Sequence, residues 1–251
     1  MNERILEMNC KTMNETPGSL HKHDGYFCET CMNKGIVFFI KDDDVWSRNC
    51  ECKKIRKNLR LIEKSGLGSV IRDKTFDAFR VSANWQGALL ERAKSFVDES
   101  YYKTFFVGGQ PGSGKTHLCT AMCGEFIKQG KETRYFLWTR EVRDLKGYGD
   151  WRYEEKMREL REVEVLYIDD YLKVMRGATP TPSDMAIAFE ILNSRLLDPT
   201  KITIISSELT INELLELDEG TASRICERTG PYAINVSRSP DKNFRLRGKK
   251  E

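Results

Sequence analysis

A glycine-rich stretch at residues 109–116, G-Q-P-G-S-G-K-T, constrains the fold of this chain more than any other feature. It follows the apolar run T-F-F-V and precedes a helical pattern, and it matches the P-loop spacing at every fixed position. Glycines let the backbone curl so that successive N–H groups and a helix N-terminus face a polyphosphate. The sequence therefore predicts a strand, a phosphate-binding loop and a helix in succession.

The loop residues predict how ATP or ADP is held with magnesium. Lys115 is expected to reach the β- and γ-phosphates, and the Thr116 hydroxyl is expected to ligate Mg²⁺. The alternative is a glycine-rich turn with an incidental lysine, which the flanking strand and helix disfavour. The other candidate nucleotide contacts in this stretch are Gly109, Gly112, Ser113, Gly114 and His117.

Two adjacent acids end the apolar run V-E-V-L-Y-I-D-D, and a P-loop needs a carboxylate partner for its metal. Asp169 is expected to hold Mg²⁺ through water, and Asp170 is expected to orient the attacking water. Two solvent-facing acids at a strand end are the alternative. The strand-like T-R-Y-F-L-W lies between the two motifs. This order suggests an additional-strand ATPase rather than a simple nucleotide kinase.

From about Thr75 onward, short β-rich runs alternate with helical patterns, which favours an α/β fold with a parallel sheet. The expected strands are 104–107, 133–138, 163–168, 201–205 and 233–236. The expected helices are 84–99, 116–129, 153–161, 182–197 and 211–217. Thr181 with Asp184, and Thr210 with Glu213, predict capping boxes at two helix starts. Cys119 and Cys123 are expected to pack the helix after the P-loop on the sheet rather than to bind metal.

Five of the eight cysteines lie in the first 52 residues, which indicates a separate N-terminal unit. C-E-T-C and C-E-C, with eighteen residues between them, form two close pairs that can clamp one tetrahedral Zn²⁺. Four thiolates leave no open position, so the predicted zinc is structural. The predicted ligands are Cys28, Cys31, Cys50 and Cys52. His21, His23 and Cys10 are alternative ligands or parts of a mobile tail.

These patterns predict four segments. Residues 1–22 form a flexible N-terminal tail, 23–55 a small zinc-binding module, 56–74 a basic helix and a linker with a breaker at 65–69, and 75–251 an ATPase domain with a basic C-terminal tail. A unit of about 40 residues rarely folds on its core alone. Structural zinc contributes about 10–16 kcal/mol of apparent binding energy, which is enough to decide whether this module folds.

Composition limits the remaining function classes. No apolar run approaches the ~18 residues of a membrane span, and the acidic start lacks a signal-like stretch, so we expect a cytoplasmic protein without a membrane partner. The net charge is only +3, so attraction to nucleic acid must come from local patches such as the basic helix at 53–64 or the tail at 238–251. A solvated surface explains these patches equally well. Tyr148 and Trp151 are candidates for stacking on single-stranded bases, whereas residues 135–138 suit the core.

The ordered motifs resemble the DnaC/DnaI-type replicative helicase loaders and their IstB-like relatives among the AAA+ ATPases. The resemblance runs from about residue 75 to 247 and depends on T-F-D-A-F, G-Q-P-G-S-G-K-T-H-L, L-Y-I-D-D, I-I-S-S-E, S-R-I-C-E-R and N-F-R. It implies a three-layer α/β/α P-loop AAA+ ATPase core in an ATP-dependent homo-oligomer, with ATP bound between neighbours. The DnaI-type loaders also carry an N-terminal zinc-binding module, which implies that this module docks the helicase.

The resemblance assigns roles to further residues. Arg228 matches the arginine finger that reaches the neighbour's γ-phosphate, Arg224 lies one helical turn earlier and is expected to assist, and Arg245 matches the sensor 2 arginine. An ordinary solvated arginine is the alternative for each. Glu208 departs from the family's sensor 1 asparagine, and its carboxylate would repel a γ-phosphate. Either Ser207 takes the polar role or Glu208 turns away, and we expect slow, switch-like hydrolysis.

Together these features predict an ATP-dependent loader of a replicative hexameric helicase onto single-stranded DNA during replication initiation. An IstB-like transposition ATPase acting on duplex DNA is one alternative, and the zinc module favours the loader. A metabolic P-loop kinase is another, which Arg228 and the doubled acid disfavour. The sequence leaves open which helicase is bound, whether the gene is chromosomal or phage-borne, the oligomer size, and whether ATP binding or hydrolysis triggers release.

Overall fold

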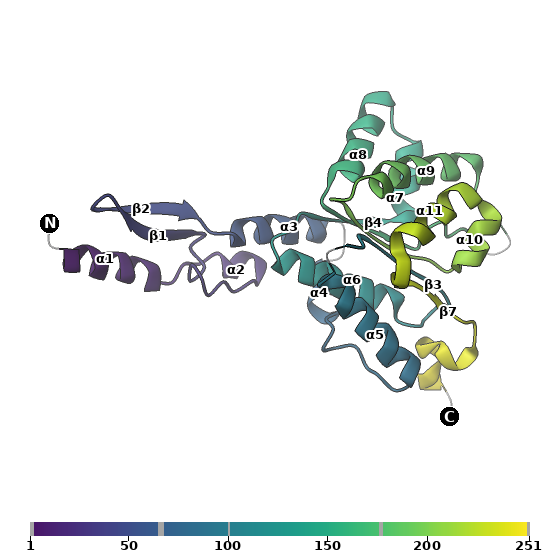
Figure 1. Cartoon of the computed structure of the whole chain (residues 1–251), viewed down its shortest axis with the longest axis horizontal. Helices are drawn as coiled ribbons and strands as arrows, with labels where there is room; N and C mark the ends of the chain where they lie inside the picture. Colours follow the sequence, from purple (N-terminus) through teal and green to yellow (C-terminus); the bar gives the residue numbers. More distant parts are fainter. Residues whose placement is uncertain (1–2, 65–67, 100, 176–177, 250–251) are drawn as a thin grey trace.

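The chain forms an α/β domain from which the N-terminal segment projects as a narrow arm (Figure 1). The structure is a computed structural model that describes residues 3–64, 68–99, 101–175 and 178–249. None of the helices in these ranges is long and apolar enough to cross a membrane.

A five-stranded parallel sheet forms the centre of the domain. Its strands are β3 (Thr104–Gly109), β4 (Thr133–Leu137), β5 (Val165–Asp169), β6 (Ile202–Ser206) and β7 (Ala233–Val236), in the spatial order β4-β5-β6-β3-β7. Because β6 separates β3 from β5, the strand before the P-loop is not a neighbour of the strand that ends in the two acids. This order confirms the additional-strand connectivity.

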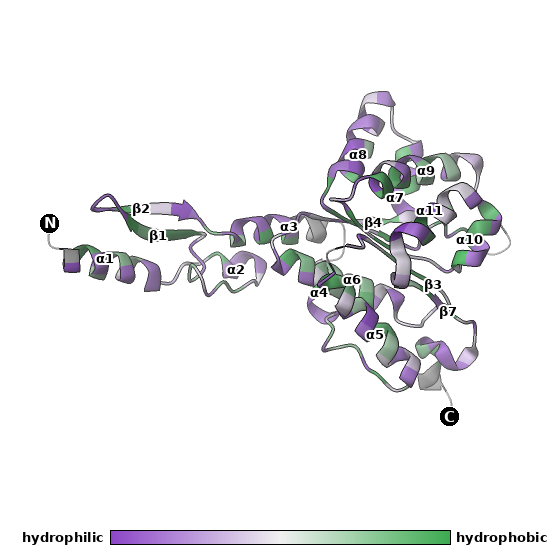
Figure 2. Ribbon diagram, in the orientation of Figure 1, coloured by the Kyte–Doolittle hydropathy of each residue, from purple (hydrophilic) through white to green (hydrophobic). Residues whose placement is uncertain are grey.

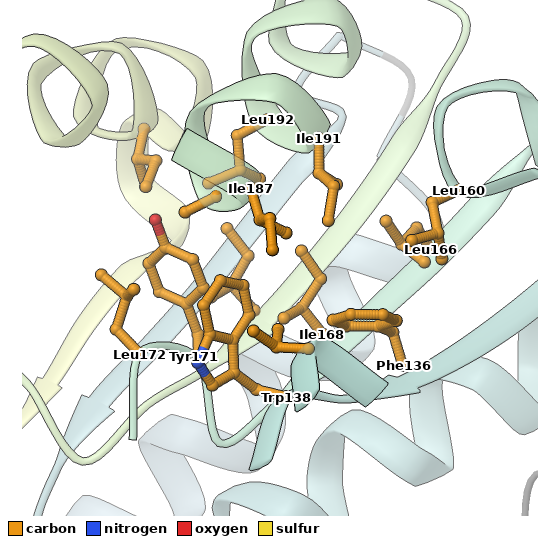
Figure 3. Packing of buried hydrophobic residues seen from close by; sticks show 14 of the residues in the cluster. Phe136, Trp138, Leu160, Leu166, Ile168, Tyr171, Leu172, Ile187, Ile191 and Leu192 are labelled. Carbon is orange, nitrogen blue, oxygen red and sulfur yellow. The ribbon is translucent and has the colours of Figure 1, made fainter. Parts of the chain in front are cut away.

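Helices cover both faces of the sheet, which confirms the three-layer α/β/α architecture. Phe105 and Val107 pack on one side against α5 (Asn84–Val97) and α6 (Lys115–Lys128). Phe106 points to the other side. That side is covered by α7 (Trp138–Lys146), α8 (Asp150–Glu162), α9 (Pro182–Leu197), α10 (Ile211–Leu217) and α11 (Glu219–Thr229). Figure 3 shows Ile187 and Ile191 of α9 directed at the sheet residue Ile168.

Several local predictions are confirmed. Both capping boxes are present, at Thr181 and at Thr210. Cys119 and Cys123 are buried in the core between α6 and the sheet, as expected for packing residues. The aromatic run at residues 135–138 contributes buried Tyr135, Phe136 and Trp138 to the core.

Element boundaries differ from the sequence expectations in the segment between β4 and β5. The strand expected over 133–138 ends at Leu137, because Trp138 begins α7 and packs its ring 5.2 Å from that of Tyr171. The sequence patterns did not predict α7. They also did not predict α11, which lies later in the chain, after α10. The helix expected over 153–161 begins earlier, at Asp150, and the following strand begins at Val165.

The arm begins with α1 (Glu3–Glu15) and α2 (His21–Asp24) and continues into an antiparallel hairpin of β1 (Ile36–Lys41) and β2 (Asp44–Asn49). Within the segment expected to be a flexible tail, α1 packs beside the apolar strand β1, which Figure 2 colours green. The flexibility of that segment stays a prediction. The Asn14 side chain exchanges two hydrogen bonds with the Phe38 backbone, at 2.8 and 2.9 Å. These bonds tie α1 to the hairpin.

Helix α3 (Cys52–Lys64) joins the arm to the domain. Ile55 contributes to the core beneath α6, and the Asn58 side chain donates to the Lys131 carbonyl at 2.5 Å. Lys57 pairs with Glu132 at 3.2 Å. Residues 65–67 of the expected breaker lie outside the described residues, and α4 (Gly68–Asp73) follows. Thus α3 is docked on the domain through these contacts, whatever its other basic side chains bind.

Short 3₁₀ segments complete the C-terminal region: η1 (Gly230–Tyr232), η2 (Pro240–Lys242) and η3 (Phe244–Lys249). The η1 segment leads into β7, and η2 and η3 then carry the chain from β7 back to the P-loop, where the Phe244 N–H donates to the Gly112 carbonyl at 3.0 Å. The C-terminal segment therefore packs directly on the phosphate-binding loop.

Candidate functional site

The P-loop lies between β3 and α6 and is shaped by glycines at close approaches. Gly109 and Gly112 have positive φ angles of 103° and 74°, which side-chain-bearing residues rarely adopt. A Cβ at Gly109 would lie 2.1 Å from the Val236 carbonyl oxygen, and one at Gly112 would lie 2.1 Å from Asn243 Oδ1. Gly109 is therefore required both for conformation and for space, since the Val236 backbone cannot easily move, whereas at Gly112 conformation is the stronger requirement because the Asn243 side chain can shift.

Lys115 is folded back over the loop that precedes it. Its Nζ donates to the carbonyls of Gly109 and Gln110, both at 2.8 Å. Burial lowers the pKa of Lys115 to about 8, although the charges of Glu208 and Asp170 act in the opposite direction. An anion bound in the loop would favour the protonated lysine, so the site is electrostatically suited to phosphate.

Thr116 and Asp169 meet as a magnesium site requires. The Thr116 hydroxyl donates to Asp169 Oδ1 at 3.2 Å, and Tyr135 donates to Asp169 Oδ2 at 3.1 Å. The Ser206 hydroxyl also donates to Oδ1. A hydroxyl beside a buried, oriented carboxylate supplies the hard oxygen ligands that Mg²⁺ prefers. The donor set therefore fits the expected ion.

The second acid, Asp170, lies in a charged cluster with a lysine and the sensor-strand glutamate. Lys173 Nζ contacts Asp170 Oδ2 at 3.1 Å and Glu208 Oε1 at 2.8 Å. Burial first, and then the charge of Asp169, raises the pKa of Asp170 above its usual value. The three side chains are about one-third exposed, so each can face a ligand in the site.

Both residues at the sensor 1 position have partners within the chain. Ser207 is buried, donates its hydroxyl to the Tyr171 carbonyl at 2.8 Å and accepts from the Leu209 N–H at 3.0 Å. Its hydroxyl is thus bonded to backbone groups behind the site. Glu208 faces the cavity at the P-loop instead of turning away, and Lys173 neutralises it. In this geometry the Ser207 hydroxyl is occupied by backbone groups, and a nucleotide contact at Ser207 stays a prediction.

One cavity gathers most of the other predicted residues. Its walls include P-loop residues, His117, Asp170, Glu208 and Arg245. The His117 Nε2 atom is 2.8 Å from the Thr75 carbonyl oxygen, and its ring packs edge-on against Phe79. His117 thus anchors the T-F-D-A-F segment beside the P-loop. Ser113 is buried and donates to the Gln110 carbonyl at 2.8 Å, which holds the loop's shape.

Arg228 and Arg224 lie elsewhere. Arg228 lines a separate cavity with Thr104 and Lys201, at the amino ends of β3 and β6, whereas the P-loop follows the carboxyl end of β3. Arg224 is exposed on the same helix and donates to the Asn193 side chain. Arg228 therefore lies near the amino ends of the strands, whereas the P-loop of the same chain lies at their carboxyl ends.

The four N-terminal cysteines converge in the arm. Their sulfurs lie within 4.8 Å of one another, with Cys28 and Cys50 at 3.8 Å and Cys31 and Cys52 at 3.5 Å. Four sulfurs at about 2.3 Å from a central Zn²⁺ lie roughly 3.8 Å apart, whereas a disulfide needs about 2.05 Å. The buried all-thiol set fits zinc. His21, His23 and Cys10 are not members of this cluster.

Arg56 lies directly beside the cysteines and is only 2% exposed, so it is not part of a solvated basic face. Its guanidinium contacts Asp24 at 2.5 Å and Asn33 Oδ1 at 3.2 Å, and lies 5.4 Å from the Tyr26 ring centre. Hydrogen bonds to Asp24 and Cys52 raise the pKa of Arg56 against the opposing effect of burial. If zinc held the four cysteines as thiolates, the buried Arg56 cation beside them would offset part of their negative charge.

Sequence reasoning missed three residues at these sites. Lys173 and Lys74 line the cavity at the P-loop, and Asn243 fills the space over Gly112. The spacing of Lys173 three residues after Asp170 was an available signal. The positions of Lys74 and Asn243 depend on the packing of segments distant from the P-loop, and no local pattern marks them.

Comparisons with known proteins agree with this fold. The profile of the IstB-like ATP binding protein family matches residues 53–239. The uncharacterised protein YqaM of Bacillus subtilis is 35% identical over 207 residues, covering 77% of this chain and 64% of YqaM. The phage-like element PBSX protein XkdC of the same organism is 32% identical over 237 residues, covering 89% of this chain and 87% of XkdC.

The replicative helicase loader DnaC of Escherichia coli is 27% identical over 166 residues, covering 58% of this chain and 66% of DnaC. Among solved structures, DnaI matches with a TM-score of 0.51 and 22% identity over 68% of this chain and 92% of that one. The DnaC helicase loader matches with a TM-score of 0.52 and 18% identity over 67% of this chain and 98% of that one. The structural matches share the P-loop AAA+ fold described above.

Proposed function

Because the chain belongs to the IstB-like ATP binding protein family, we propose that it is an ATP-dependent loader that places a replicative hexameric helicase on single-stranded DNA during replication initiation. The single observation that supports this most is the joining of two units: a P-loop domain and a projecting cysteine arm, linked by the docked helix α3 (Figure 1). Such an arrangement suits a protein that reports nucleotide state to a bound partner.

The nucleotide chemistry follows from the side chains around the cavity. Lys115 binds phosphate oxygens, and Thr116 with Asp169 would hold Mg²⁺, which neutralises charge on the phosphates when bound. Asp170 orients the attacking water, and its environment raises its pKa, which suits a group that accepts a proton. Arg245, on the wall of the same cavity, contacts the phosphates from within its own subunit. Hydrolysis is slow because Asp170 is also held by Lys173.

ATP-dependent homo-oligomerisation completes the site. Arg228 is exposed at the sheet edge opposite the P-loop of its own chain, a position that supports contact with a neighbouring subunit's nucleotide. A guanidinium placed there stabilises charge that develops on the neighbour's γ-phosphate. Arg224, one turn earlier on α11, faces Asn193 of its own chain and has an assisting role at most.

The arm is the proposed docking element for the helicase. Zinc held by the four cysteines keeps the hairpin and α3 in a fixed arrangement, since structural zinc sites supply folding energy directly. The arm exposes several large apolar side chains to solvent, including Met8, Phe27 and Trp46. Exposed apolar residues of this kind favour a protein partner.

Single-stranded DNA is the proposed nucleic-acid partner. Trp151 is 75% exposed at the start of α8 and is available to stack on a base. Tyr148 is less available, because Arg152 lies over its ring at 4.4 Å from the centre. Trp151→Ala should weaken single-stranded DNA binding without altering nucleotide affinity, whereas Tyr148→Leu should have the smaller effect.

A pull-down with purified replicative helicase tests the function. We expect capture by the intact chain, its loss in the Cys28→Ser, Cys31→Ser double variant, and a difference between ATP and ADP. Cys226→Ser, at a half-buried cysteine outside the arm, is the matched control. Failure to capture any replicative helicase, together with ATP-dependent binding of duplex DNA, would favour a transposition ATPase. Phosphate transfer to a small acceptor would favour a kinase.

A further inference from the structure

The nucleotide cavity contains a charge arrangement that the proposed function does not explain. Asp170 and Glu208 both face the cavity, and a triphosphate would bring further negative charge to the same place. Like charges a few ångströms apart in a poorly hydrated site repel strongly. Some cation must therefore make a site with these two carboxylates suitable for ATP.

Lys173 is placed to be that cation. It follows β5 by a tight turn in which its N–H donates to the Asp170 carbonyl at 3.0 Å, with Asp170 and Leu172 at positive φ angles of 55° and 54°. This turn directs the lysine side chain back over the end of the sheet. Its Nζ then lies 3.1 Å from Asp170 Oδ2 and 2.8 Å from Glu208 Oε1.

The ammonium geometry leaves room for a third acceptor. An ammonium carries three N–H donors, and the two carboxylates account for two of them. Lys173 lines the same cavity as Lys115 and Thr116, so its remaining N–H can reach a ligand there. Lys115 covers the start of the loop through Gly109 and Gln110, while Lys173 lies on the side of the acids. The two lysines thus lie on different sides of the same cavity.

We propose that Lys173 is the residue through which this chain distinguishes ATP from ADP: it neutralises Glu208 and Asp170 and donates its remaining N–H to the terminal phosphate of ATP. This inference rests on the proposed ATPase function. In ADP that phosphate is absent, so Lys173 stays with its two carboxylates alone. Glu208, the departure from the usual sensor asparagine, then acts as the fixed partner that holds the lysine in position.

The test is equilibrium binding of a non-hydrolysable ATP analogue and of ADP, each with Mg²⁺, to the full chain. Lys173→Met should weaken analogue binding by about tenfold or more, the typical effect of losing a hydrogen bond to a charged group, and should change ADP binding by about twofold at most. Lys173→Arg should restore part of the preference for the analogue, because the charge and donors are kept.

A double variant separates sensing from mere folding. In Lys173→Met with Glu208→Gln the repulsive carboxylate is removed, so analogue affinity should recover partly relative to Lys173→Met alone. Lys94→Met on α5, where Lys94 pairs with Glu91 three residues away on the surface, is the matched control and should leave both affinities unchanged. Thermal unfolding of each variant shows whether it is folded.

The possible failures are distinguishable. If the intact chain binds neither nucleotide, the proposed ATPase function is wrong. If it binds both, and Lys173→Met weakens the two ligands equally or neither of them, Lys173 does not sense the terminal phosphate and the inference alone is overturned. Additive effects in the double variant would likewise contradict the pairing of Lys173 with Glu208 during nucleotide binding.

Discussion

Arg56 and Asp24 form an ion pair at 2.5 Å, with their side chains only 2% and 8% exposed. Asp24 ends α2, just before the first cysteine pair, and Arg56 lies on α3, the helix that docks on the domain. The pair therefore joins the start of the cysteine module to the helix that leaves it. Removing one partner of such a buried ion pair strongly lowers stability, because the remaining charge is then buried without compensation.

Breaking this pair should destabilise the arm. Arg56→Met leaves the Asp24 carboxylate buried without its partner, an effect of about 3–5 kcal/mol on unfolding in comparable buried pairs. Zinc affinity should fall by about 10–100-fold, as for other groups that support metal ligands from behind. Thermal unfolding and chelator competition measure the two effects. Lys54→Met, which removes an exposed lysine paired with Glu51, should change neither value.

Purified, reduced protein should contain one zinc per chain. Elemental analysis should give about one equivalent, and Cys28→Ser with Cys31→Ser should remove it, because two thiolates cannot complete a tetrahedral site. Zinc well below one equivalent would contradict the assignment. Chelation should unfold the arm yet change nucleotide affinity little. Asn58 of α3 contacts Lys131, which follows the C-terminal end of α6, whereas Lys115 of the P-loop lies at the N-terminal end of that helix.

Nucleotide affinity should fall as pH rises through about 8. The free protein holds the pKa of Lys115 near 8 through burial, and phosphate binds the protonated form, so binding raises this pKa. Affinity is then greatest below pH 8 and declines by up to about tenfold per pH unit above it. Lys115→Arg should bind with no such decline because arginine stays charged. Lys115→Ala should lose most binding at every pH, and wild-type affinity in that variant means that the site has been misassigned.

Asp170→Asn should bind ATP but hydrolyse it about 10²–10⁴ times more slowly, because the amide cannot accept the water's proton. Asp169→Asn should instead weaken Mg²⁺-dependent binding, since Asp169 contacts Thr116 directly. Nucleotide titration with and without Mg²⁺, followed by single-turnover hydrolysis, separates the two variants. Equal effects on binding and hydrolysis from both substitutions would remove the distinction between the two acids.

Arg228 should act on the neighbouring subunit. Arg228→Ala should bind nucleotide normally and lose hydrolysis by about 10³–10⁵-fold, the range for arginine fingers in other systems. Mixing it with Lys115→Ala should restore some ATPase activity, because one chain supplies an intact P-loop and the other an intact finger. Size-exclusion chromatography with ATP must show co-assembly. If the chains co-assemble and no activity returns, the shared-site mechanism is wrong.

Local spacing was sufficient for the features whose residues are close in sequence. The P-loop, the adjacent acids and the paired cysteines each require particular residue types at short, fixed intervals, so their chemistry is evident from the order of residues. The sequence also suggested the additional-strand topology, because the strand between the P-loop and the two acids can be recognised as an apolar run. The roles of these residues stay predictions that the variants above address.

Tertiary structure decided the features that depend on distant segments meeting. The sequence placed the residues of α1 in a flexible tail, whereas their packing on the hairpin involves Asn14 reaching the backbone of Phe38, a contact between segments distant in sequence. Arg56 has the sequence context of a solvated basic helix, and only the fold buries it against Asp24. Lys173 and Glu208 lie on different loops, and only the fold brings the lysine to the carboxylate that was expected to repel a γ-phosphate. An amino-acid sequence specifies each charge, but the energy of a charge depends on burial and on partners, which the folded chain alone determines.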